Sequence, residues 1–126
     1  MKYKNITATI DADCIRHNLT YLQDKTGTEI MPVIKANAYG HGMLQISKIL
    51  RGAGIKMIGV ATLGEAIFLR ENGDTGIIVA WLYDIRSPEV KTAIHKNIDI
   101  SIIDENHIPT LLSLIPKNHN FVFICL

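Results

Sequence analysis

The chain has 126 residues, of which 48% are hydrophobic and 20% charged, and its formal net charge at pH 7 is +1. This composition suits one modest domain with a real core, and the near balance of charge excludes a dedicated nucleic-acid binder. No apolar run approaches the roughly 20 residues that span a bilayer, and the opening MKYKNITATIDAD lacks the apolar stretch of a signal peptide, so we expect a soluble, cytoplasmic protein.

Strand-like and helix-like segments alternate from the start of the chain. Residues 6–10 (ITATI) predict a short strand. Asp11 stands at the N-cap position of a helix that Gly27 ends. Residues 30–34 (IMPVI) predict a buried strand, to which Pro32 is a mild objection because proline lacks the amide that donates in a β-ladder.

After the loop KANAYGHG, strand and helix patterns repeat. The predicted strands span residues 57–61 (MIGVA), 77–82 (IIVAWL), 98–103 (IDISII) and 121–126 (FVFICL). The predicted helices span residues 43–50, 65–70, a segment with Ser87 as N-cap and Pro88 as first helical residue, and 105–114.

This alternation predicts an α/β fold with a parallel sheet covered on both faces. Either a doubly wound sheet or a (β/α)8 TIM-type barrel fits, and the barrel version comprises about the first four βα units plus a fifth strand, preceded by one short strand and helix. A complete barrel takes about 250 residues. Residues 1–126 end inside an apolar strand, whose edge would be open. We therefore expect a truncated piece, or a half that needs a partner.

The two cysteines, Cys14 and Cys125, lie near opposite ends of the chain. They have neither CxxC spacing nor a histidine cluster, so we expect no zinc site. Isolated cysteines suit buried thiols in a reducing cytoplasm.

The segment with candidate chemistry is VIKANAYGHG, residues 33–42. Lys35 follows a predicted buried strand, at the end where barrel enzymes place catalytic groups. Burial disfavours a charged amine, and a neutral amine is the nucleophile that forms a Schiff base. Tyr39 could hydrogen-bond a phosphate, and Gly40 and Gly42 allow the backbone to approach a ligand closely.

Taken one at a time, these residues have ordinary explanations. A lysine at a strand end is more often solvated or ion-paired, and a Gly-His-Gly segment is more often only a turn. His41 is better explained as a structural residue than as a proton carrier, and no neighbouring residues supply a metal site around it.

The string KANAYGHG resembles the pyridoxal phosphate (PLP) attachment signature of alanine racemases almost letter for letter. ATIDADCIRHNL is similar to the opening strand and helix of that family, including Asn18. GVATLGEAIFLRENG resembles its next βα unit, with Glu65, Arg70 and Gly73 in place, and IIVAWL resembles the following strand. The resemblance runs from about Ile6 to the end of the chain and is most specific at residues 33–42.

The resemblance implies a fold-type-III PLP enzyme that interconverts L-alanine and D-alanine, supplying D-alanine for the cell wall. Lys35 matches the lysine that holds PLP as an internal aldimine and acts as one of two catalytic bases. Tyr39 matches a tyrosine that contacts the PLP phosphate, and Trp81 falls where a strand residue lines the cofactor, although core packing explains it almost as well. Glu65 and Arg70 match as helix and fold residues.

The resemblance also implies residues that lie outside this chain. The second base in the family is a tyrosine from the other subunit of a homodimer, and an arginine lies near the pyridine nitrogen. Tyr3, Tyr21 and Tyr83 do not stand in the sequence context of that base. We therefore expect little racemase activity from residues 1–126 alone.

Three alternatives stay open. The first is another PLP-barrel enzyme, such as a serine racemase, or a decarboxylase of related fold. The second is a non-catalytic fragment of a disrupted racemase gene, which the coding sequence beyond Leu126 would reveal. The third is a doubly wound nucleotide-binding domain, which ranks last because no G-x-G-x-x-G follows the first strand.

Overall fold

The computed structural model describes residues 7–117 and, by their backbone alone, residues 123–125. Its sheet has four parallel strands in the order β1-β2-β3-β4. The strands are β1 (Met57–Thr62), β2 (Ile77–Leu82), β3 (Asp99–Ile102) and β4 (Phe123–Cys125). The helices are α1 (Ala12–Thr26), α2 (Lys35–Tyr39), α3 (Met43–Gly52), α4 (Leu63–Glu71), α5 (Pro88–His95) and α6 (Ile108–Leu114), with the 3-10 turn η1 (Glu105–His107) before α6.

The helix boundaries follow the capping residues of the sequence. The Asp11 carboxylate accepts from the backbone N–H groups of Asp13 and Cys14, which confirms it as the N-cap of α1. Gly27 ends α1 with φ +64°, and Ser87 caps α5. Among the described residues, no helix combines the length and apolar composition that crossing a membrane requires.

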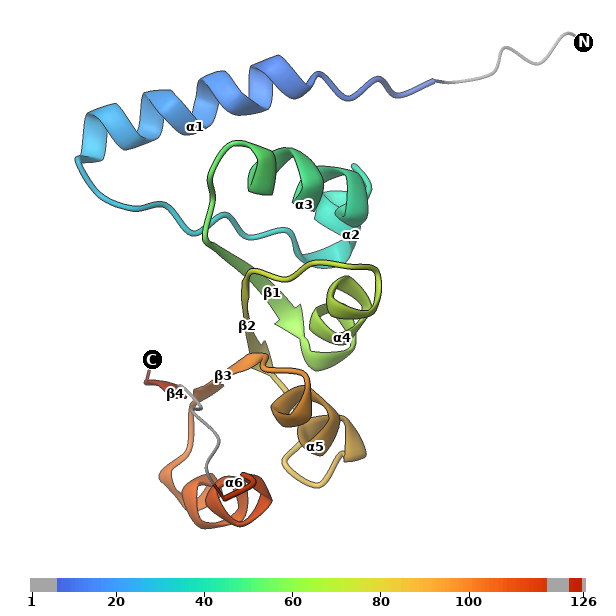
Figure 1. Cartoon of the computed structure of the whole chain (residues 1–126), viewed down its shortest axis with the longest axis vertical. Helices are drawn as coiled ribbons and strands as arrows, with labels where there is room; N and C mark the ends of the chain where they lie inside the picture. Colours follow the sequence, from blue (N-terminus) through green and yellow to red (C-terminus); the bar gives the residue numbers. More distant parts are fainter. Residues whose placement is uncertain (1–6, 118–122, 126) are drawn as a thin grey trace, which may run out of the picture.

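The helices that connect the strands lie along one face of the sheet, as Figure 1 shows for α4, α5 and α6. The consecutive strand order explains this, because successive right-handed crossovers place every helix on the same face. A doubly wound sheet reverses its strand order and gains helices on both faces. The described part of the chain therefore does not have the doubly wound arrangement that the sequence left open.

Side chains alternate between the two faces of the sheet. Ile58, Val60, Ile78 and Ile100 are fully buried against the helices. Their neighbours along each strand point to the other face, which we call the helix-free face. By alternation and register it consists of Val33, Met57, Gly59, Ala61, Ile77, Val79, Trp81, Asp99 and Ser101.

Two predicted strands differ in the structure. Residues 7–10 form no strand, because the chain there runs away from the sheet and has no neighbour to pair with (Figure 1); Ile6 lies outside the described residues. Residues 30–34 make a single bridge, Val33 to Gly59 in β1. Pro32 takes part only through its carbonyl, which accepts from the Gly59 N–H at 2.9 Å. The N–H that proline lacks is therefore not needed for this pairing.

The amino ends of the strands are joined by Arg51, from the last turn of α3. Its guanidinium contacts both carboxylate oxygens of Asp74 and donates to the carbonyls of Ile55 at 3.0 Å and Ile77 at 2.9 Å. The Asp74 side chain is only 4% exposed, and it also accepts from the Ser47 hydroxyl. Burial opposes ionisation of Asp74, but the hydrogen bonds from Arg51 and Ser47 outweigh it and lower its pKa.

Arg70 repeats this arrangement one βα unit later. From the last turn of α4 it donates to the carbonyls of Gly76 at 3.0 Å, Lys96 at 2.9 Å and Asn97 at 2.8 Å. These carbonyls precede β2 and β3, so the side chain joins the starts of two strands. This is the role in the fold that the family resemblance implied.

Cys14 is exposed, so the expectation of a buried thiol is wrong for this residue. It lies in the first turn of α1, a helix that packs on α3 and buries only Leu19. The neighbouring Asp11 carboxylate raises the pKa of the Cys14 thiol, through a hydrogen bond and its negative charge. The side chain of Cys125 lies outside the described residues.

Candidate active site

Lys35 lies at the carboxyl end of the short segment that pairs with β1, where the sequence placed it. The preceding residue, Ile34, donates its N–H to the Gly59 carbonyl at 2.9 Å. Lys35 then opens α2, and the chain leaves the sheet in a left-handed turn. The candidate lysine therefore lies where a strand-like segment ends and a left-handed backbone begins.

The turn is left-handed over consecutive residues other than glycine. Ala36, Asn37 and Ala38 have φ between 52° and 54° and ψ between 44° and 50°, and Tyr39 has φ 54°. For L-residues this conformation costs roughly 1–2 kcal/mol per residue relative to a right-handed helix. Such strain persists only where surrounding contacts impose it, and it clusters at functional sites.

Hydrogen bonds within the segment impose part of this conformation. The Ala38 N–H donates to the Ile34 carbonyl at 2.8 Å. The Asn37 side-chain oxygen accepts from the Met43 N–H at 2.8 Å, and this bond joins the turn to the start of α3. His41 Nδ1 lies 2.8 Å from the Ala38 carbonyl, in agreement with the structural role expected for this residue.

A longer-range contact comes from Glu65 in the first turn of α4. One carboxylate oxygen accepts from the Ala36 N–H at 2.6 Å, and the other accepts from the N–H groups of Ala61 and Thr62 at 2.9 and 3.1 Å. The Thr62 hydroxyl accepts in return from the Glu65 N–H, which completes a capping box. Glu65 thus connects the end of β1 and the start of α4 to the peptide that follows Lys35.

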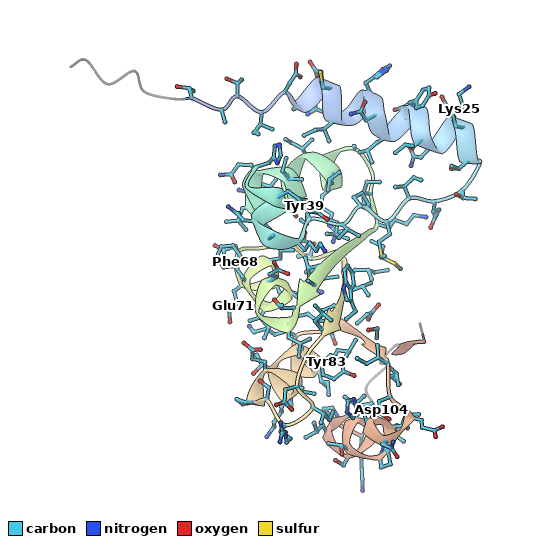
Figure 2. All side chains as sticks on the ribbon, turned by 180° about the vertical axis from the view of Figure 1, so that it is seen from behind. Lys25, Tyr39, Phe68, Glu71, Tyr83 and Asp104 are labelled. Atoms are coloured by element: carbon cyan, nitrogen blue, oxygen red, sulfur yellow. The ribbon has the colours of Figure 1, made fainter. Side chains whose placement is uncertain are left out.

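The two signature side chains of the turn lie near each other. The Lys35 Nζ is 5.9 Å from the centre of the Tyr39 ring, within the range of a cation–π contact. Lys35 is half-buried and, within residues 7–117, forms no ion pair. Tyr39 is 63% exposed, and in Figure 2 its label stands above that of Phe68 of α4. Both polar groups are therefore accessible to a ligand.

Trp81 of β2 lies on the helix-free face, over Gly59. A Cβ atom at Gly59 would lie 3.0 Å from Cζ3 of Trp81 and 3.2 Å from Cγ2 of Val33. Gly59 therefore leaves the space in which the indole meets the segment leading to Lys35. The structure brings Trp81 beside that segment, and in the described part of the chain Trp81 forms no aromatic pair with Tyr39 and no cation–π contact with Lys35.

Further along the helix-free face lie Asp99, Ser101 and Tyr83, and the buried Ser101 hydroxyl has no hydrogen-bond partner within the described residues. Burial raises the pKa of Asp99, against the opposing charge of Arg70. The Tyr83 hydroxyl donates to the Ser101 carbonyl at 3.0 Å, and burial raises its pKa. Tyr21 is 54% exposed on α1, which packs on α3 (Figure 1); Tyr3 lies outside the described residues. Within residues 7–117, neither Tyr21 nor Tyr83 forms a hydrogen bond or cation–π contact with Lys35.

Sequence reasoning missed two features of this site. We expected residues 35–42 to form a loop, and only Gly40 and Gly42 signalled positive φ angles. The pattern Thr62-x-x-Glu65 is a capping-box signature, so the local role of Glu65 could have been predicted. Its bond to Ala36, 29 residues earlier, could not, because no sequence pattern fixes a contact between separate segments.

Comparison with known proteins identifies relatives across most of the chain. The profile of the family described as alanine racemase, N-terminal domain, matches residues 10–123. The alanine racemase of Mycolicibacterium vanbaalenii is 45% identical over 78 residues, which make up 61% of this chain and 20% of that protein.

Solved structures that resemble the fold include two racemases. Alanine racemase from Corynebacterium glutamicum gives a TM-score of 0.79 at 32% identity, over 90% of this chain and 33% of that one. Histidine racemase from Leuconostoc mesenteroides gives a TM-score of 0.74 at 30% identity, over 82% of this chain and 28% of that one. The chain thus spans between 20% and 33% of the length of these relatives. Because the family profile matches well over half of it, the chain belongs to the alanine racemase N-terminal domain family.

Proposed function

We propose that this chain is the PLP-binding part of a cytoplasmic alanine racemase and that Lys35 carries the cofactor. The observation behind the proposal is the accessible Lys35 amine, which has no ion-pair partner within residues 7–117 and lies next to Tyr39. It stands in a segment that the family profile covers. In the full-length protein the open sheet would form the first part of a TIM-type barrel.

The residues present fit PLP. The Lys35 amine is free to bond the PLP aldehyde carbon, and the exposed Tyr39 hydroxyl is free to donate to the phosphate. Trp81 offers an aromatic surface beside the segment that leads to Lys35. When bound, PLP supplies an electron sink for the charge left at the substrate α-carbon.

The role of Lys35 beyond binding is to exchange a proton with the α-carbon on one face of alanine. Racemisation needs a second acid–base group on the opposite face. The Tyr83 hydroxyl, just after β2, already donates to the Ser101 carbonyl, so we assign that group to a part of the full-length homodimer outside this chain. We therefore expect the purified chain to racemise alanine far more slowly than a full-length enzyme.

A second candidate substrate class is another amino acid. A histidine racemase matches this chain at 30% identity with a TM-score of 0.74. These values are close to those for the alanine racemase of Corynebacterium glutamicum, which favours the alternative. Racemisation assays of the full-length protein with alanine, serine and histidine would separate these candidates.

The cofactor proposal is tested by incubating the purified chain with PLP, reducing with borohydride and mapping the modified lysines by mass spectrometry. We expect Lys35 to be labelled in preference to other lysines and Lys35→Ala to abolish that product. Lys48→Ala is the matched control, because Lys48 is an exposed lysine on the nearby α3. Equal labelling of Lys35 and Lys48 would contradict the proposal.

A further inference from the structure

We infer that Glu65 is a positioning residue for Lys35, acting through the hydrogen bond between its carboxylate and the Ala36 N–H. The inference rests on the proposed function of Lys35. It assigns to Glu65 a role beyond capping α4. The bond to Ala36 is 2.6 Å long and joins residues that are 29 positions apart in the sequence.

The two carboxylate oxygens of Glu65 accept hydrogen bonds from different segments. Oε2 accepts from the N–H groups of Ala61 and Thr62, the last two residues of β1, and Thr62 is also the N-cap of α4. Oε1 accepts from Ala36 and takes no part in capping. A helix cap alone would need only the first oxygen, so the second bond is a separate function of the same side chain.

The bond is made by the peptide that joins Lys35 to the left-handed turn. Ala36 is the first left-handed residue, with φ 52° and ψ 50°, and its amide directly follows Lys35. A charge-assisted hydrogen bond is about twice as strong as a neutral one. Glu65 therefore fixes the backbone from which the Lys35 side chain extends, and it offsets part of the cost of the left-handed turn.

Glutamine at position 65 separates the two functions. It keeps the size of the side chain and one acceptor oxygen, which can still cap α4. Its other terminal group is an NH2, which donates and cannot accept from the Ala36 N–H. Thr62→Ala is the converse variant, because it removes the hydroxyl that accepts from Glu65 and leaves the bond to Ala36 in place.

The experiment compares E65Q and T62A with the unaltered chain, at a temperature where all three are folded. The readouts are the rate of Lys35 labelling by PLP and borohydride, relative to Lys48, and the hydrogen exchange of the Ala36 amide. We expect E65Q to slow relative labelling by about tenfold and to speed Ala36 exchange by a similar factor, since a hydrogen bond to a charged group contributes on that scale. We expect T62A to lower the thermal midpoint with relative labelling within about twofold of the unaltered chain.

Parallel loss of labelling in E65Q and T62A would overturn the inference, because it would make Glu65 a helix cap only. Unchanged labelling and exchange in E65Q would also overturn it. If the unaltered chain shows no preference for Lys35, the proposed function fails, and Ala36 exchange alone then decides whether Glu65 orders the turn.

Should E65Q not fold, the unaltered chain still provides a test. Ala36 is an exposed residue, yet its amide should exchange as slowly as the amides of α4. Exchange at the rate of an unstructured peptide would contradict the bond.

Discussion

The amino and carboxyl ends of the strands are built in opposite ways. At the amino ends, Arg51 and Arg70 donate to a series of backbone carbonyls, and the Asp74 carboxylate is enclosed by its partners. At the carboxyl end, Lys35 has no ion-pair partner within residues 7–117 and Tyr39 is exposed. The first region satisfies its charges internally, whereas the second leaves polar groups accessible to a ligand.

With the role proposed for Lys35, the two ends of the sheet would separate stability from function. Barrel enzymes place chemistry at the carboxyl ends of their strands and stability at the amino ends. Here the arginines at one end connect successive βα units, while the other end holds a left-handed turn that is unfavourable by itself. The comparison implies that mutations at the two ends should affect different measurements.

The largest expected effect is from Arg51→Ala. It leaves the buried Asp74 carboxylate without its cation, and removing one partner of a buried ion pair costs roughly 3 kcal/mol or more of unfolding free energy. Urea denaturation measures this loss, and relative Lys35 labelling under folding conditions should not change. Lys56→Ala, in an exposed pair with Glu29, is the control and should have little effect. Loss of Lys35 labelling in folded Arg51→Ala would break the proposed separation.

An intermediate effect is expected from Gly59→Ala. The added methyl group would meet the Trp81 ring and a Val33 methyl group at 3.0–3.2 Å, and overpacking of this kind costs about 1–3 kcal/mol. Trp81 is the single tryptophan of the chain, so its fluorescence reports movement of the ring directly. We expect a shifted emission maximum and slower Lys35 labelling. Unchanged emission would mean that the sheet absorbs the methyl group without moving Trp81.

The smallest effect on stability is expected from Ala36→Gly. Glycine adopts the left-handed conformation without the steric cost of a Cβ atom, while it raises the entropy of the unfolded chain. The balance should leave stability unchanged or increase it by about 0.5–1 kcal/mol, while a more flexible turn slows Lys35 labelling. Ala12→Gly, in the right-handed α1, should instead destabilise the chain. A large loss of stability in Ala36→Gly would show that the turn is not strained.

Local signals in the sequence determined much of the secondary structure. Asp11 and Ser87 began helices where predicted, because a side-chain acceptor beside free backbone amides acts over a few residues. Apolar runs such as IIVAWL predicted the strands β1 to β3 correctly, and the family resemblance is confirmed for residues 10–123. The roles of Lys35, Tyr39 and Trp81 stay predictions.

Only the tertiary structure decided the rest. Residues 7–10 have a strand pattern but no neighbour, and a strand is stable only when another segment accepts its hydrogen bonds. The left-handed turn after Lys35 opposes the local preference of alanine, asparagine and tyrosine, so contacts from elsewhere must impose it. Glu65 provides one such contact. Its two oxygens accept from Ala36 and Ala61, in segments that meet only when the chain has folded. Sequence therefore predicted a candidate lysine, and folding determined the backbone from which its side chain extends.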